Sequence, residues 1–187
     1  MTFENHPLSH VLSYFKNKQD IEMQFSIYEY QPQNVFDNRA FIDVLAKDVN
    51  EKWITDKLKS LAVGEELAFH SVYKKGQRKY HLPMIDFDCS VQDLKYAKAT
   101  LYKILPNHIY SGLVFYESGR SLHAYGSTGL NNKQWIDFMG RLLLANLPNE
   151  PSIVDTRWVG HRLMGGFSSL RWSSNSGMYL KVPSRII

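Results

Sequence analysis

From residue 66 onward, hydrophobic patterns with strand and helix periods alternate, and this alternation limits the fold more than any other feature. Residues 66–73 and 78–88 have the alternation of two strands separated by a turn, so they predict a hairpin. A helix is expected next, because Ser90 begins a capping-box-like start and apolar residues then recur on one helical face as far as Pro106. The middle of the chain therefore predicts a hairpin that leads into a helix.

The same order repeats further along the chain. Residues 109–116 and 122–125 predict a second pair of strands. A helix capped by Asn131 or Asn132 is expected over 131–146, and 153–159 predicts a final strand. Hairpins that alternate with helices favour an α+β fold with a mostly antiparallel sheet and helices on one face. A split β-α-β arrangement is the natural candidate.

The first third of the chain has weaker patterns. A short helix is expected over 9–15, and a strand over 25–30 is followed by a turn at 31–34. Residues 38–61 predict a helix, because a broken apolar stripe with a helical period continues until Gly64 stops it. We expect this part of the chain to supply a second layer of the fold.

Composition excludes several classes of protein. Of the 187 residues, 44% are hydrophobic and 21% are charged, which is the balance of a globular rather than a disordered chain. The single cysteine, Cys89, excludes an intrachain disulfide and a multi-cysteine zinc site, and it fits a reducing compartment. The start has no leader pattern, and no apolar run approaches the roughly 20 residues of a membrane span. We therefore expect a cytoplasmic protein with no membrane partner.

Two carboxylates stand at the end of the second predicted strand. Asp86 and Asp88 are two residues apart, so on a strand both side chains point to one face, while Ile85 and Phe87 point to the other. Side-by-side carboxylates repel, and they are tolerated where a hard cation such as Mg²⁺ lies between them. Taken alone, the pair is explained more simply by a polar strand end in which Asp88 caps the next helix.

The second predicted hairpin brings three polar groups together. Ser121 and His123 share one face of a short strand, and Arg120 belongs to the tight glycine turn just before it. A hydroxyl, an imidazole and a guanidinium beside free backbone N–H groups suit a phosphate. Taken alone, the segment is also explained by a surface hairpin with a satisfied histidine.

The C-terminal segment carries a carboxylate followed by arginines. Asp155 follows two apolar residues on the last predicted strand, so it could be a third carboxylate for the same cation, and Arg162 and Arg171 come after it. From Asp155 to Ile187 there are five basic residues and one acidic residue, a difference equal to the whole formal net charge of +4. Aromatic residues lie among them. Such a segment suits a nucleic-acid groove, and a solvated tail with core aromatics is the alternative.

The order of these clusters resembles the archaeo-eukaryotic primase superfamily. That family includes primase small subunits, primase-polymerases and the polymerase domains of bacterial end-joining ligases. The resemblance rests on hydrophobic-Asp-hydrophobic-Asp at 85–88, Ser-x-His at 121–123 behind a glycine turn, and hydrophobic-Asp at 154–155 with downstream arginines. Members have an RRM-like module packed against a small α/β module, with the catalytic site between the two. For this chain the resemblance thus implies an RRM-like, mostly antiparallel sheet beside a small N-terminal α/β module.

The resemblance also implies a metal-dependent nucleotidyltransferase that extends a nucleic-acid 3′ end or initiates a primer. Two divalent ions, Mg²⁺ or Mn²⁺, would be held by the three carboxylates Asp86, Asp88 and Asp155.

Further implied contacts concern the substrates. Ser121 and His123 would contact the phosphates of an incoming NTP or dNTP. Arg162 and Arg171 would contact phosphate or a DNA or RNA template and primer. Arg120 is added to these nucleotide-binding residues because of its place in the glycine turn, and the resemblance does not imply it.

We expect one compact primase-like catalytic domain over 1–187, with an N-terminal α/β sub-module at 1–65 and an RRM-like, motif-bearing sub-module at 66–187. One cysteine cannot build the zinc module of many primases, so we expect this chain to need a protein partner or a primer.

Two other hypotheses stay open on the sequence. The first is a non-catalytic RRM-like module that binds RNA or DNA, which would not require the three carboxylates to lie on one side. The second is a metal-dependent nuclease or a relative of rolling-circle replication proteins. That class would need an H-x-H pair, which the chain lacks, although His70 and His81 could face each other across the predicted hairpin.

Overall fold

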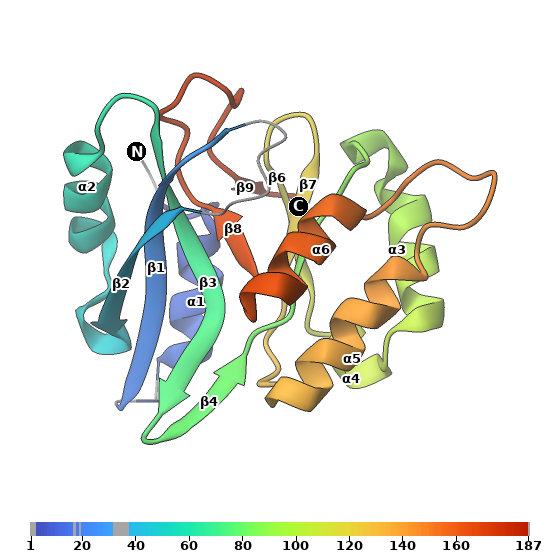
Figure 1. The fold of residues 1–187 in the computed structure, drawn as a ribbon, viewed down its shortest axis with the longest axis horizontal. Coiled ribbons are helices and arrows are strands. Elements are labelled where there is room, and N and C mark those ends of the chain that lie inside the picture. The colour runs from blue at the N-terminus through green and yellow to red at the C-terminus, as the bar shows by residue number, and fades with distance from the viewer. Residues whose placement is uncertain (1–2, 17, 19, 32–37, 187) are drawn as a thin grey trace.

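Two antiparallel sheets form the frame of the molecule (Figure 1). The computed structural model describes residues 3–16, 18, 20–31 and 38–186. Within these residues the first sheet, sheet A, has the strand order β2-β1-β3-β4, and β8 also pairs with β3. Its strands are β1 (Ile21–Glu29), β2 (Arg39–Leu45), β3 (Glu65–Lys75), β4 (Arg78–His81) and β8 (Ser169–Arg171).

The second sheet, sheet B, has the strand order β5-β7-β6-β9. Its strands are β5 (Met84–Asp86), β6 (Val114–Glu117), β7 (Leu122–Tyr125) and β9 (Ser184–Arg185). The chain passes from sheet A to sheet B at Pro83, which has no N–H group for a ladder hydrogen bond. The prediction of one strand over 78–88 is therefore wrong, because β4 and β5 belong to different sheets.

Helices cover one face of each sheet, and the predicted α+β class with antiparallel strands is confirmed. The helices are α1 (Pro7–Phe15), α2 (Glu51–Ser60), α3 (Leu94–Ile104), α4 (Asn107–Tyr110), α5 (Asn132–Leu143) and α6 (Thr156–Gly165), with short 3-10 turns η1 (Ala46–Asp48) and η2 (Val91–Asp93). The predicted capping box at Ser90 is present, and Asn131 caps α5. These local features follow directly from the sequence.

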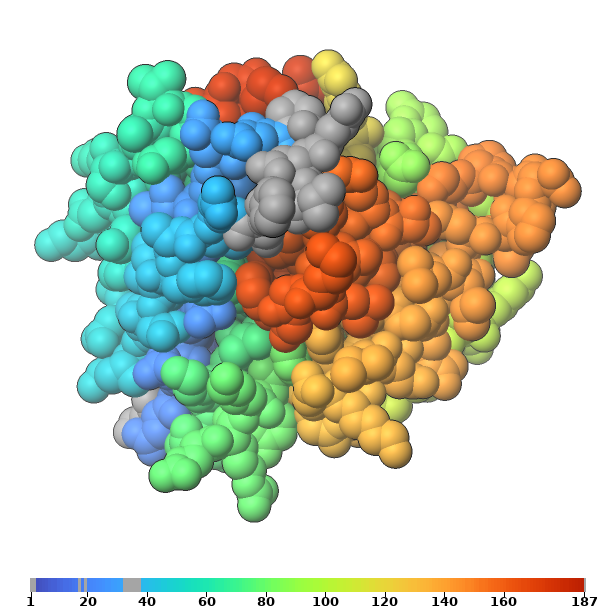
Figure 2. All heavy atoms as spheres, in the orientation of Figure 1, coloured from blue at the N-terminus to red at the C-terminus, as the bar shows by residue number. Residues whose placement is uncertain are grey.

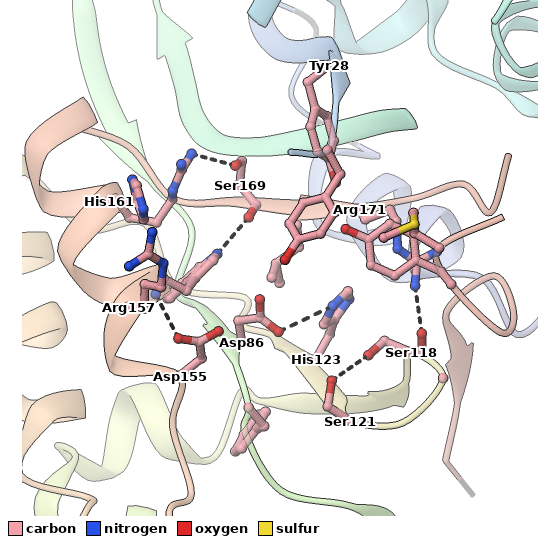
Figure 3. A pocket seen from close by; sticks show the side chains of 18 of the residues that line it. Tyr28, Asp86, Ser118, Ser121, His123, Asp155, Arg157, His161, Ser169 and Arg171 are labelled. Carbon is pink, nitrogen blue, oxygen red and sulfur yellow. Dashed lines mark hydrogen bonds and ion pairs between the residues drawn. The ribbon is translucent and has the colours of Figure 1, made fainter. Parts of the chain in front are cut away.

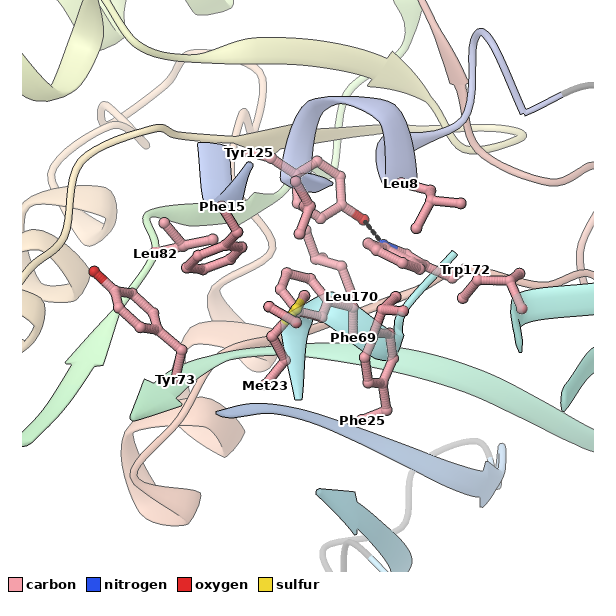
Figure 4. Packing of buried hydrophobic residues seen from close by; sticks show 14 of the residues in the cluster. Leu8, Phe15, Met23, Phe25, Phe69, Tyr73, Leu82, Tyr125, Leu170 and Trp172 are labelled. Atoms are coloured by element: carbon pink, nitrogen blue, oxygen red, sulfur yellow. Dashed lines mark hydrogen bonds between the residues drawn. The ribbon is translucent and has the colours of Figure 1, made fainter. Parts of the chain in front are cut away.

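The first hydrophobic core, core 1, lies between sheet A, α1 and α2 (Figure 4). Alternation along β1 and β3 turns Met23, Phe25 and Phe69 toward it. Trp172 packs on Phe25 and Phe69, and its Nε1 donates a hydrogen bond to the hydroxyl of Tyr125 at 3.1 Å. Because Tyr125 belongs to β7, core 1 joins the two sheets.

One face of sheet B contributes to core 1. The second core, core 2, lies between the opposite face of sheet B and the helices α3, α4 and α5. Ile85 and Phe87 point into it from β5 and the residue after, as the alternating pattern predicts. Trp135 enters it from α5. Burial of these apolar side chains sets the orientation of the neighbouring polar residues, which must face the opposite side.

The prediction of a helix over 38–61 is wrong in its first half. Residues 39–45 form β2, η1 follows, and only 51–60 are helical. Ile42 and Val44 lie on either side of Asp43 and pack against core 1, so strand pairing with β1 determines the conformation here. The turn expected at 31–34 lies outside the described residues apart from Gln31.

Two other strand predictions are also corrected. The strand over 109–116 begins only at Val114, because 107–110 form α4 and place Ile109 in core 2. The strand over 153–159 is replaced by one bridge between Val154 and Phe87, followed by α6. Short apolar runs fit a strand and a helical turn equally well, so periodicity alone did not distinguish them.

The two histidines considered as a facing pair do not face each other. His70 lies opposite Ser169 in the register of β3 and β8, whereas His81 stacks on Trp135 with ring centroids 4.6 Å apart. The expected boundary at residue 65 also does not separate the sheets, since β3 pairs with β1. The division into sub-modules stays a prediction. In the part of the chain that the structure describes, no helix has the length and apolar character to cross a membrane.

Candidate active site

A cavity of about 730 Å³ lies where β1 and β8 of sheet A meet β5 and β7 of sheet B (Figure 3). All of the site residues predicted from the sequence line it, although they come from four separate segments: Asp86, Asp88, Arg120, Ser121, His123, Asp155, Arg162 and Arg171. The tertiary structure thus brings the three sequence clusters together. Their chemical roles stay predictions.

Asp86 and His123 form the floor of the cavity. Asp86 ends β5 and is the register partner of His123 in β7, so both side chains point to the same face of sheet B. Their Oδ1 and Nε2 atoms are 3.5 Å apart. Ile85 and Phe87 hold this arrangement, because their burial in core 2 leaves Asp86 no other direction.

Asp86 carries a strongly perturbed carboxyl group. Burial raises its pKa to about 8, and the nearby charges of Asp155 and Asp88 add to the rise, while Arg171 and Arg162 oppose it. The backbone explains the proximity of Asp155, whose N–H donates to the carbonyl of Asp86 at 3.1 Å. Without a cation beside it, this carboxyl therefore holds a proton at neutral pH.

His123 is a buried neutral imidazole. Burial, and then the charge of Arg171, lower its pKa well below the ordinary value. Its Nδ1 is buried and has no hydrogen-bond partner among the described residues. A buried polar atom without a partner costs free energy, so this nitrogen is available to a group that enters the cavity.

Asp155 has a structural role as well as a place in the cavity. It is the N-cap of α6, where its Oδ1 accepts a hydrogen bond from the N–H of Trp158 at 2.9 Å. The capping explanation that the sequence suggested for Asp88 therefore applies to Asp155. Asp88 is exposed, and its N–H donates to the carbonyl of Ile153.

The arginines form the wall that faces the carboxylates. Arg171 is buried, donates to the carbonyl oxygens of Ser118 (2.6 Å), Lys181 (3.2 Å) and Ser173, and stacks on the ring of Tyr179 at 3.9 Å. Arg162, from the last turns of α6, donates to the Oγ of Ser169 at 2.8 Å.

These contacts fix both guanidinium groups before any ligand binds. Preorganised cations of this kind suit phosphate oxygens.

The hairpin between β6 and β7 supplies the remaining predicted residues. Its turn needs Gly119, because residues that carry a side chain rarely adopt a φ of 128°. The Oγ atoms of Ser118 and Ser121 are 3.3 Å apart, and Arg120 is exposed at the tip. The hairpin therefore presents hydroxyl groups and one exposed cation at the edge of the cavity.

The comparisons with known proteins agree with this geometry. The model of the archaeo-eukaryotic primase 1D-like family matches residues 45–184, which is most of the chain. The chain belongs to the archaeo-eukaryotic primase 1D-like family. Searches among curated proteins and among solved structures found no match. At the family level, the match supports a primase-type nucleotidyltransferase, and it confirms the resemblance noted in the sequence.

Several residues of this primase-like cavity were not predicted. Tyr28 and Arg39 reach it from β1 and β2, outside the matched segment, and the Arg39 guanidinium lies 4.1 Å from the ring of Tyr28. Arg157 and His161 line it from α6, where a spacing of four residues puts them on one face. That spacing would have been a usable signal if 153–159 had not been assigned to a strand. Tyr179 is one of the aromatic residues that lie among the basic residues of the C-terminal segment.

The family implies a divalent cation, and the donor chemistry fits one only in part. The adjacent carboxyls of Asp86 and Asp155 are hard oxygen donors. The raised pKa of Asp86 shows that the surrounding positive charge is too small to keep this carboxyl ionised at neutral pH. In the described residues, no group of three or more histidine, cysteine, aspartate or glutamate side chains is arranged to hold a metal ion. Asp86 and Asp155 are thus the residues on which a cation would depend.

Proposed function

We propose that this cavity binds a nucleoside triphosphate beside a nucleic-acid 3′ end and transfers the nucleotide to that end. One observation carries the proposal: carboxylates and arginines from four separate segments line a single cavity, and nucleotidyl transfer needs both kinds of group. The carboxylates would act at the reacting phosphate, and the arginines would neutralise the rest of the triphosphate.

The residues of the chain have distinct parts in this proposal. Arg171 and Arg162 bind and orient the triphosphate, because their guanidinium groups are already fixed by backbone and hydroxyl oxygens. Ser121 and Arg120 contact phosphate from the hairpin tip, and the free Nδ1 of His123 takes a hydrogen bond with the nucleotide. Asp86 and Asp155, with Asp88 at the cavity edge, would hold Mg²⁺ or Mn²⁺, which would supply Lewis-acid activation of the 3′-hydroxyl and of the leaving pyrophosphate.

Primer extension tests the proposal directly. The chain is incubated with a primed and an unprimed template, NTPs or dNTPs, and Mg²⁺ or Mn²⁺, beside the double variant Asp86→Ala/Asp88→Ala. We expect incorporation that the variant abolishes. The double variant Asp48→Ala/Asp56→Ala, which removes two exposed carboxylates outside the cavity, should retain it.

The primed and unprimed templates also separate two modes of action. Extension without de novo synthesis is the result expected of a chain that relies on a protein partner to start primers. Equal incorporation by the wild type and the Asp86→Ala/Asp88→Ala variant would refute catalysis at this site.

A second candidate is a non-catalytic module that binds RNA or DNA. It is favoured by the exposed position of Asp88 and by the lack, within the described residues, of a three-ligand metal group. In that case nucleic acid would bind with the same affinity with and without the carboxylates, and no nucleotide would be incorporated under any condition.

A further inference from the structure

One face of sheet A carries polar and aromatic side chains and lies opposite core 1. We call it the outer face and define it by three register pairs of β1 and β2: Gln24 with Asp43, Ser26 with Phe41, and Tyr28 with Arg39. Register partners point to the same side of a sheet, so these six side chains share one surface. The helices α1 and α2 pack on the other side (Figure 1).

An exposed aromatic ring stands in the middle of the outer face. Phe41 is 55% exposed and meets the rings of His70 and Phe167 edge-on, with centroids 5.4 and 5.7 Å apart. His70 stacks on Phe167 at 4.4 Å, and its two ring nitrogens bond to Gln24 and Ser26. Phe41 therefore rests on a rigid support while its own ring faces solvent.

A second cavity, of about 380 Å³, lies at the far end of the outer face. It is lined by Gln24, Phe167 and two lysines of the β3–β4 hairpin, Lys74 and Lys79. The hairpin segment 74–79 contains four basic residues and no acidic one. In Figure 2 this hairpin (green) projects from the lower edge of the molecule.

The acidic groups on this surface are already engaged. Glu22 pairs with Lys74, and Asp43 accepts a hydrogen bond from the side chain of Gln24 at 2.9 Å. The charge left for a ligand is therefore positive. On the outer face of the hairpin it belongs to the exposed Lys79, which is the register partner of Lys74. Lys75 is the register partner of Ile21, so it lies on the side of core 1.

The outer face connects the two cavities. Tyr28 and Arg39 line the candidate active site, whereas Gln24 and Lys74 line the second cavity. Along β1, the distance from Tyr28 to Glu22, which is the register partner of Lys74, is six residues, or roughly 20 Å. An extended chain that enters the active site can therefore continue over Phe41 to the basic hairpin.

We infer that the outer face binds single-stranded nucleic acid, with a base stacked on Phe41 and backbone phosphates at the β3–β4 hairpin. This inference rests on the proposed function for the direction of the strand, which leads to the candidate active site. An exposed stacking ring and a lysine at the far end of the same face match a strand of bases and phosphates, because both are recognised without regard to sequence. A protein segment would need a continuous apolar groove, and here one exposed ring is surrounded by polar groups.

Fluorescence anisotropy tests this inference with fluorescein-labelled 10-mers of oligothymidylate and oligouridylate. EDTA is present and nucleotide is left out, so that catalysis plays no part. We expect Phe41→Ala to weaken binding roughly 5- to 100-fold. The matched control is Tyr102→Ala on α3, which removes an aromatic ring that is 64% exposed and should leave binding unchanged.

The hairpin is tested by the salt dependence of the same binding. Lys79→Ala should reduce the slope of log affinity against log salt by up to about 0.7, which is the contribution of one phosphate contact on a single strand. Lys52→Ala/Lys59→Ala removes two exposed lysines from α2, behind the sheet, and should change the slope less.

The outcomes separate this inference from the proposed function. Three results would each overturn the inference, even if primer extension succeeds: wild-type affinity of Phe41→Ala, failure of the wild type to bind either oligomer, or a change of slope in Lys52→Ala/Lys59→Ala as large as that in Lys79→Ala. Loss of binding in Phe41→Ala with no nucleotide incorporation by the wild type would uphold the inference and refute the proposed function.

Discussion

Neighbours from distant segments determine how single residues of the site behave. Asp86 and Asp88 are two residues apart and look equivalent in the sequence. Asp86 lies beside Asp155 in the cavity, with 25% of its side chain exposed, whereas Asp88 is exposed at the edge. Burial raises the pKa of Asp86 to about 8, so the chemistry at this residue depends on the tertiary structure.

Asp86→Asn is expected to remove a pH dependence from the stability of the protein. Because its folded pKa of about 8 lies above its ordinary value of 3.8, the wild type loses stability as pH rises through this window. Asp86→Asn has no such proton. Its free energy of unfolding should therefore rise relative to that of the wild type as the pH increases from 5 to 8.5. Urea unfolding at several pH values measures the difference.

Asp88→Asn is the matched control for this experiment, and its pH dependence should follow the wild type. Parallel curves for Asp86→Asn and the wild type would contradict the raised pKa. Added Mn²⁺ should stabilise the wild type at pH 8 more than Asp86→Asn, because a cation takes the place of the proton.

Glu66 is a buried carboxylate that anchors the segment after β8. It accepts hydrogen bonds from the N–H groups of Asn175 and Ser176 at 2.9 and 2.8 Å, and from the hydroxyls of Ser173 and Ser176. Glu66→Ala would leave these donors without a partner and is expected to lower the free energy of unfolding by about 3 kcal/mol.

Glu66→Gln keeps an acceptor oxygen and should lose clearly less stability in the same urea titration. Equal losses for alanine and glutamine would show that the hydrogen bonds are not the cause.

At the scale of elements, α6 links the two cavities. Its first turn brings Asp155 and Arg157 to the candidate active site, and its C-terminal end, capped by Gly166 in the left-handed conformation, lines the second cavity. The sequence pattern at 153–159 resembled a strand because Ile153, Val154 and Val159 are apolar. They are buried in core 2 on either side of the helix start, which periodicity alone could not reveal.

Two substitutions of Asp155 separate its capping role from its proposed catalytic role. Both Asp155→Ala and Asp155→Ser remove the charge next to Asp86, but serine retains an oxygen that can accept from the N–H of Trp158. Asp155→Ser should therefore be more stable than Asp155→Ala by about 1 kcal/mol in thermal or urea unfolding. Both should lose nucleotide incorporation. Full incorporation by either variant would exclude Asp155 from catalysis.

At the scale of the whole molecule, buried histidines connect different parts of the fold. His6 bonds to the carbonyl of Trp172, His70 stacks on Phe167, and His81 stacks on Trp135. Burial is the main cause that lowers their pKa values to about 4, about 2 and about 4. All three are therefore neutral in the folded protein at neutral pH.

These groups predict a stability maximum close to neutral pH. Below the ordinary histidine pKa of 6.5, these histidines bind protons in the unfolded chain but not in the folded chain. The free energy of unfolding therefore falls as pH decreases. Asp86 acts in the opposite direction and lowers stability toward pH 8. Urea unfolding from pH 4.5 to 8.5 should give a maximum between about 6 and 7, and a steady rise across that range would contradict it.

The sequence by itself determined the fold class and the starts of the helical segments after Ser90 and Asn131, and it proposed eight site residues that line one cavity. Those features depend on local patterns: alternation turned Asp86 away from Phe87, and Ser90 and Asn131 satisfied the first N–H groups of their helices. The tertiary structure alone decided that the chain forms two sheets, that β2 is a strand, and that Tyr28 and Arg39 complete the cavity. The reason is physical, because strand pairing and burial join residues far apart in the chain, and no local pattern records which partner a segment will find.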